Sequence, residues 1–202
     1  MATKDNFFQT SDGLWLYYEM HGSGKPILLL PGFGESLKMW RHSVPVLSEG
    51  HQVICLDLRG HGRSMKVPGG NRQVRMAQDV RELIDHLGLQ DVLLVGHSLG
   101  GAMASQFAAD HPDEIDGLIL LGAYLYGDYS PEDTLTVYGS LNQSVEDEID
   151  YTENVVEIQG GNHAQFGNYG PQKGDAPATI SAEEQQARTV EAVAEFIARR
   201  QG

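Results

Sequence analysis

Short apolar runs alternate along most of this chain with segments whose apolar residues recur at helical spacing. Runs that are apolar throughout are typical of strands covered on both faces, as in a parallel sheet. The pattern therefore predicts an α/β fold with a mostly parallel central sheet and helices on both faces. The predicted strands are residues 14–18, 27–30, 52–56, 92–95, 118–121, 134–138 and 155–158.

Local signals add three details. The turn residues at 22–26 predict a hairpin between the first two strands. Gly88 predicts the end of a helix whose apolar residues reach Leu87. A last helix is expected after Ser181, because Glu184 completes a capping box, and its apolar stripe is Val190, Val193, Ala194 and Ile197.

The length of 202 residues suits a single domain over 1–202. The formal net charge is −14, which disfavours nucleic acid and anionic membrane surfaces as partners. Residues 82–172 contain no Lys or Arg, so nearly all of the surplus negative charge lies there.

One cysteine, Cys55, lies in an apolar run and is expected to be an inert core thiol. The N-terminus has no signal-peptide pattern, and no apolar run approaches the ~20 residues of a membrane span. We therefore expect a cytoplasmic protein that needs no metal or organic cofactor. The sequence does not indicate an oligomeric state.

The segment Gly96-His97-Ser98-Leu99-Gly100 follows a predicted strand and opens a helix of small residues. G-x-S-x-G in this context is typical of a nucleophile elbow, where a tight turn exposes the serine at the carboxyl edge of the sheet. The helix behind it points backbone N–H groups at a developing oxyanion. Ser98 is therefore the candidate nucleophile.

Around this motif the chain resembles the α/β-hydrolase fold superfamily, specifically its serine carboxylesterases and lipases, over nearly its whole length. The loop 30–34 is similar to the one that supplies an oxyanion-hole N–H, which would be that of Phe33 beside Leu99. Residues 57–64 are similar to the structural turn D-x-R-G-x-G-x-S. The segments 160–167, 170–172 and 178–181 resemble an uncharacterised bacterial subgroup of hydrolases.

The resemblance implies that His163, which follows the last strand, is the catalytic base. The other seven histidines have structural explanations, and His97 occupies the variable position of the elbow. The acidic stretch around the catalytic edge is expected to disfavour anionic substrates and to help keep His163 protonated.

The expected acid of the triad is missing. The superfamily pattern is Gly-Ser-x-Asp, whereas residues 139–142 are Gly-Ser-Leu-Asn. Asn142 can accept a hydrogen bond from His Nδ1 but cannot stabilise an imidazolium. Three hypotheses remain: another carboxylate serves, with Asp128 preferred to Asp147; Asn142 is a natural or engineered substitution in a slow hydrolase; or the chain is a pseudo-enzyme that binds a ligand.

A cap would have to fit within residues 122–133, which are too few for a helical lid. An uncapped pocket favours small or short-chain esters, with Tyr124 and Tyr126 on one wall, together with Ala123, Leu125 and Tyr129, although packing over the sheet edge explains the tyrosines equally well. The expected reaction is acyl transfer through Ser98. Epoxide hydrolases and haloalkane dehalogenases would need aspartate there, whereas perhydrolase, amidase and C–C hydrolase chemistry stay open.

Overall fold

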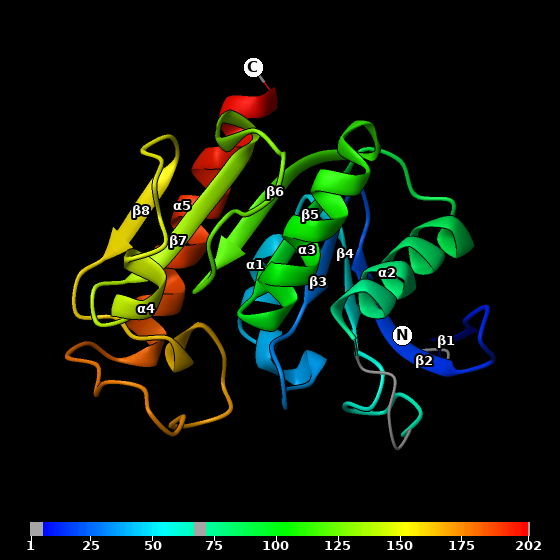
Figure 1. Ribbon diagram of the computed structural model, residues 1–202, viewed down its shortest axis with the longest axis horizontal. Coiled ribbons are helices and arrows are strands. Elements are labelled where there is room, and N and C mark those ends of the chain that lie inside the picture. The colour runs from blue at the N-terminus through cyan, green and yellow to red at the C-terminus, as the bar shows by residue number, and fades with distance from the viewer. Residues whose placement is uncertain (1–5, 67–71, 202) are drawn as a thin grey trace.

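The computed structural model describes residues 6–66 and 72–201, which form an α/β fold around one eight-stranded sheet (Figure 1). The strand order is β1-β2-β4-β3-β5-β6-β7-β8. Only the pairs β1–β2 and β2–β4 are antiparallel, so the sheet is mostly parallel, as predicted. The strands are β1 (Asn6–Gln9), β2 (Trp15–Gly22), β3 (Lys25–Leu30), β4 (His51–Leu56), β5 (Val92–His97), β6 (Ile115–Leu121), β7 (Thr134–Gly139) and β8 (Val155–Ile158).

Helices cover both faces of the sheet. Figure 1 shows α2 (Gln73–Leu87) and α3 (Leu99–Asp110) on one face, with α1 (Ser43–Leu47) and α5 (Ala182–Gln201) behind the other. Alternate side chains of β3 serve the two faces: Leu28 and Leu30 join the core beneath α2 and α3, and Ile27 and Leu29 join the core beneath α5. The shorter elements are η1 (Leu37–Trp40), η2 (Pro112–Glu114), η3 (Pro131–Asp133), α4 (Gln143–Glu146) and η4 (Ala164–Phe166).

The predicted hairpin between β2 and β3 is wrong. Strand β4 lies between these strands and pairs antiparallel with β2 and parallel with β3. The turn residues at 22–26 do reverse the chain, but β3 is apolar on both faces and takes two parallel neighbours, β4 and β5. The hairpin partner of β2 is instead the short strand β1.

Helix α2 ends as predicted, with Gly88 in the left-handed conformation at φ 62°. Helix α5 begins as predicted after Ser181, whose hydroxyl accepts the Glu184 N–H at 3.1 Å. The predicted stripe is partly wrong, because Ala194 is exposed. The buried face of α5 keeps Val193 and Ile197 of that stripe. Its other members are Gln185, Gln186, Thr189, Ala192 and Phe196.

The turn after β4 is structural, as the resemblance implied. Both carboxylate oxygens of Asp57 accept backbone N–H groups, from Leu37 and Arg63, each at 2.7 Å. Arg59 bonds Asp79 on α2 through two nitrogens, each at 2.6 Å, and both side chains are buried. The turn therefore fixes α2 and η1 against the carboxyl edge of the sheet.

The connection from β6 to β7, residues 122–133, contains no helix longer than the three-residue η3, so no cap lies between these strands. Cys55 is buried, and burial raises the pKa of its thiol, in keeping with an inert core position. Among the described residues, no helix has the length and apolar character needed to cross a membrane.

Candidate active site

Ser98 lies at the sharp turn between β5 and α3 with φ 52° and ψ −117°, a strained conformation for a side chain with a Cβ. Its backbone N–H donates to Leu121 O of β6 at 3.1 Å, which anchors the turn to the neighbouring strand. A Cβ on Gly96 would collide with the Gly100 backbone, and one on Gly100 would collide with Leu30 O. The two flanking glycines therefore allow the turn that exposes the serine.

The N-terminus of α3 and the loop after β3 each supply a backbone donor near Ser98. Within the described part of the chain, neither Leu99 N–H nor Phe33 N–H has a protein acceptor. The Phe33 side chain is 72% exposed and its ring contacts His61 edge-on, so this residue can contribute through its backbone rather than through packing. The first N–H groups of a helix carry partial positive charge and favour an anion at this place.

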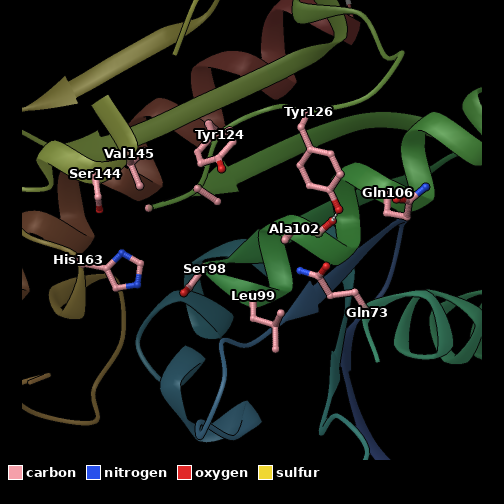
Figure 2. Close-up of a pocket in the computed structure, with 12 residues that line it drawn as sticks. Gln73, Ser98, Leu99, Ala102, Gln106, Tyr124, Tyr126, Ser144, Val145 and His163 are labelled. Atoms are coloured by element: carbon pink, nitrogen blue, oxygen red, sulfur yellow. Dashed lines mark hydrogen bonds between the residues drawn. The ribbon is translucent and has the colours of Figure 1, made fainter. Parts of the chain in front are cut away.

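A cavity of about 650 Å³ opens above the turn and brings Ser98 and His163 to the same wall (Figure 2). The hydroxyl of Ser98 is directed toward the imidazole of His163 in this view, although no hydrogen bond joins them among the described residues. The wall contains no Asp, Glu, Lys or Arg side chain among the described residues. Besides His163, the residues on the wall are Gln73, Ser98, Leu99, Ala102, Gln106, Gly122, Ala123, Tyr124, Tyr126, Ser144 and Val145.

Two of the predicted wall tyrosines do line this cavity. Tyr124 and Tyr126 lie on it together with Ala123, whereas Leu125 and Tyr129 pack against the core instead. The Tyr126 hydroxyl donates to Ala102 O at 2.6 Å (Figure 2), so it is committed to the helix α3. Tyr126 therefore offers its ring, rather than a free hydroxyl, to the cavity.

His163 lies in the loop after β8, and two side chains hold the backbone of that loop in place. Gln185 of α5 is fully buried and bonds the neighbouring Asn162 twice, accepting its N–H at 3.0 Å and donating to its carbonyl at 2.7 Å. Asp175 accepts the N–H groups of His163 at 3.2 Å and of Ala164 at 2.7 Å. Sequence reasoning missed Gln185 and Asp175, because side chains that bond the backbone of a distant loop follow no sequence motif.

The His163 ring also needs space beneath it. Gly122, the residue after β6, has φ 55°, and a Cβ there would lie 2.9 Å from His163 Nδ1. Any side chain at this position would displace the imidazole.

Asn142, which stands at the acid position that the resemblance implies, contacts the ring of His163. Asn142 is buried, and its amide Nδ2 lies 2.9 Å from His163 Nδ1. Its Oδ1 accepts the Ser144 hydroxyl at 3.1 Å. The contact is therefore made by the amide NH₂, which donates, and not by an oxygen.

Neither alternative carboxylate reaches the ring. Asp128 is exposed in the loop after β6 and, among the described residues, forms no hydrogen bond with His163. Asp147 is exposed at the end of α4, where it accepts from Gln143 at 2.8 Å. Within the residues that the structure describes, the side chain bonded to the His163 ring is that of Asn142.

Burial lowers the pKa of His163 to about 4, with a further contribution from His97, and Asp175 and Glu35 only partly oppose this. The expectation that the acidic stretch helps to keep His163 protonated is therefore wrong. Most of those carboxylates lie in water, where their field is screened, whereas removal of the ring from water acts directly on its charged form.

A second histidine lies beneath the site, which sequence reasoning had set aside. His97 is fully buried, and its Nε2 lies 3.1 Å from His163 O, a carbonyl that can only accept. Its Nδ1 lies 3.2 Å from Glu35 Oε2. Burial tends to raise the pKa of Glu35, but the hydrogen bond and charge of His97 outweigh this and lower it. The pair thus ties the loop of His163 to the loop of Phe33.

Among the described residues, no group of three or more His, Cys, Asp or Glu side chains is placed to hold a metal ion. The ring of His163 lies against that of His97, with the centroids 4.8 Å apart, and His97 in turn contacts Glu35 and the ring of Tyr169.

Comparison with known proteins agrees with this architecture. Residues 25–158 match the family model described as alpha/beta hydrolase fold. The chain is 43% identical over 110 residues to a soluble epoxide hydrolase of Corynebacterium sp. (strain C12), covering 54% of this chain and 38% of that protein. It is 35% identical over 113 residues to a putative carbamate hydrolase, RutD, of Azorhizobium caulinodans, covering 56% of this chain and 43% of that protein.

Among solved structures, the epoxide hydrolase CorEH without ligand is similar, with a TM-score of 0.56 and 39% identity over 59% of this chain and 42% of that one. The chain spans about two fifths of the length of these relatives. The family match covers well over half of the chain and includes the strand and turn that carry Ser98. This chain belongs to the α/β-hydrolase fold family.

Proposed function

We propose that this protein is a serine hydrolase that cleaves small or short-chain carboxylic esters through an acyl-enzyme on Ser98. The observation that carries the proposal is the strained turn at Ser98, which opens on a cavity shared with His163. Backbone strain of this kind persists where the surrounding structure imposes it, and it recurs at catalytic sites.

In the proposed first step, Ser98 Oγ attacks the ester carbonyl carbon while His163, in the tautomer that carries its proton on Nδ1, takes the hydroxyl proton at Nε2. The N–H groups of Phe33 and Leu99 bind the oxyanion, for which both are unpaired among the described residues. Collapse of the tetrahedral intermediate breaks the C–O bond, and His163 returns the proton to the alcohol. Water then attacks the acyl group by the same steps and restores Ser98.

The neutral state of His163 at pH 7 suits a base, but two features limit the rate. A pKa of about 4 makes the ring a weak acceptor for a serine proton. The amide of Asn142 supplies no negative charge to the imidazolium, and loss of that charge in a serine protease lowers the rate roughly 10⁴-fold. We therefore expect turnover well below that of an esterase with a complete triad.

The uncharged wall of the cavity supports a neutral substrate, and its aromatic and aliphatic side chains suit a short acyl or alkyl group. The epoxide hydrolases resemble this chain in sequence as well as in fold, but residue 98 of this chain is a serine, and the proposed acyl-enzyme route uses its hydroxyl. A chain-length series of nitrophenyl esters tests this substrate class: kcat/KM should peak at short acyl chains, and a maximum at C12 or longer would contradict it.

The direct test of the proposal is covalent labelling by a fluorophosphonate, which reacts with activated serines. We expect one label on the intact chain, at Ser98 by peptide mapping, and none on S98A. The matched control is Ser105, which is fully buried on the same helix α3, so S105A should be labelled like the native chain. Absence of any label on the folded native chain would refute the serine hydrolase.

One observation favours a second function. The amide NH₂ on His163 Nδ1 opposes proton acceptance at the other ring nitrogen, so the chain could act as a ligand-binding protein with little or no catalysis. Binding of a non-hydrolysable ester analogue, abolished by a bulky substitution such as A102W at the cavity wall, without labelling of Ser98, would identify this function.

A further inference from the structure

The Asn142 amide joins two partners, Ser144 and His163, and its orientation decides which ring nitrogen of His163 carries a proton. In the structure, Oδ1 accepts from Ser144 and Nδ2 lies on His163 Nδ1. An NH₂ group only donates, so Nδ1 of the neutral ring must accept and the proton must reside on Nε2. That nitrogen is the one left to face Ser98, and while it carries a proton it cannot accept the one from serine.

Turning the amide by 180° gives a second complete network. Oδ1 would then accept from a protonated His163 Nδ1, and Nδ2 would donate to the Ser144 oxygen, since a hydroxyl accepts as well as donates. Nε2 would then be free to take the Ser98 proton. Within the described part of the chain the Asn142 amide has no other partner, and although Asn142 precedes α4, its side chain makes no capping bond there.

We propose that Ser144 is a positioning residue: by donating its hydroxyl proton to Asn142 Oδ1, rather than accepting from the amide, it keeps the NH₂ toward His163 and so sets the resting tautomer of that histidine. This rests on the proposed function for its catalytic meaning, but the geometry does not depend on turnover. Among the described residues, Ser144 is the only side chain bonded to the far end of the amide. The chemistry of residue 144 therefore selects between a protonated Nε2 and a free one.

A residue at 144 that only accepts hydrogen bonds should reverse the amide. In S144D, the carboxylate accepts from Nδ2, which turns Oδ1 toward His163 and favours the Nδ1–H tautomer. Ser144 is exposed, so the variant should fold. S144T keeps a hydroxyl and should behave like the native chain. Q143D adds the same charge one residue away on the exposed side of α4 without contacting the amide, and serves as the matched control.

The experiment is ¹⁵N NMR of histidine-labelled protein at pH 7.5, where long-range correlations distinguish the two tautomers and H163Q assigns the signal. The expected result is Nε2–H in the native chain, S144T and Q143D, and Nδ1–H in S144D. A native chain that is already Nδ1–H, an S144D variant that stays Nε2–H, or a Q143D variant that switches as S144D does would each overturn the inference.

Fluorophosphonate labelling of the same samples separates this inference from the proposed function. S144D should label faster than the native chain, on the order of tenfold or more, because Nε2 becomes free to accept. A tautomer that switches while no variant is labelled supports the positioning role and refutes the hydrolase. Labelling of the native chain with a tautomer that ignores residue 144 refutes the positioning role and supports the hydrolase.

Discussion

At the scale of single residues, one atom decides how this site works. Asparagine differs from aspartate by an NH₂ in place of an oxygen, and at position 142 that NH₂ faces His163 Nδ1. A carboxylate at this position would accept a hydrogen bond from His163, whereas the Asn142 amide donates one. Sequence reasoning placed residue 142 at the acid position from Gly139 and Ser140, and the structure puts its side chain on the His163 ring. The sequence could not determine which end of the amide faces the ring, since Ser144 bonds the other end.

Replacing the amide by a carboxylate should restore the usual polarity. N142D is expected to raise kcat/KM for nitrophenyl butyrate by a factor on the order of 10² to 10⁴, because the carboxylate fixes the Nδ1–H tautomer and stabilises the imidazolium. Steady-state hydrolysis measures the gain. D128A is the control, and since Asp128 is exposed and does not bond the ring, it should leave the rate unchanged. No gain in N142D, together with loss of activity in D128A, would assign the acid to Asp128.

Burial of a neutral His163 links stability to pH. The pKa is about 4 in the folded chain against an ordinary 6.5, so the unfolded chain binds more protons between these values. The contribution of His163 to the free energy of unfolding is therefore fully present above about pH 6.5 and is lost as the pH falls toward 4. Urea titrations of the native chain and H163Q should show their difference shrinking over this range; a constant difference would contradict the burial.

At the scale of secondary-structure elements, the sequence predicted the strands and the helices that carry the site, because their apolar runs are short and well separated. It failed where a neighbour in space decides the outcome. Strand β4 inserts between β2 and β3, which no local turn signal can reveal. The buried face of α5 includes Gln185, whose amide bonds the backbone of Asn162, so a hydrophobic stripe alone misplaces that face.

Close packing at the start of α3 gives an element-scale prediction whose sign opposes helix propensity. G100A would gain up to about 1 kcal/mol from propensity alone. The added Cβ would instead press on the carbonyl oxygens of Leu30 and Pro31, so we expect a net loss of about 1–3 kcal/mol. Urea unfolding measures it. G50A is the control, since a Cβ there meets nothing within 4 Å, and it should change stability little; a stabilised G100A would show that α3 moves freely.

At the scale of the whole molecule, a chain of net charge −14 contains a cavity whose described wall has no Asp, Glu, Lys or Arg. The charge surplus of residues 82–172 lies mainly on exposed acidic side chains, for instance Glu146, Asp147 and Glu148 beside the cavity at α4. Its effect should therefore fall on the approach of a charged substrate rather than on the chemistry inside.

This separation predicts an effect of salt on one substrate class. For an ester with a free carboxylate, such as nitrophenyl hydrogen succinate, kcat/KM should rise several-fold between about 10 mM and 300 mM NaCl, as the Debye length falls from roughly 30 Å to below 8 Å. For neutral nitrophenyl butyrate it should stay nearly constant. Equal salt effects on both esters would place the charge within the catalytic step instead.

Because His163 follows Ser98 by 65 residues, the two side chains leave the ribosome at different times. During synthesis the residues of the Ser98 elbow emerge well before those of β7 and β8, and Gln185 of α5, which bonds the backbone beside His163, emerges later still. A partly made chain therefore carries the serine without its base. Reactivity at Ser98 should appear only once the last helix is in place, so that labelling reports the final step of folding rather than the first.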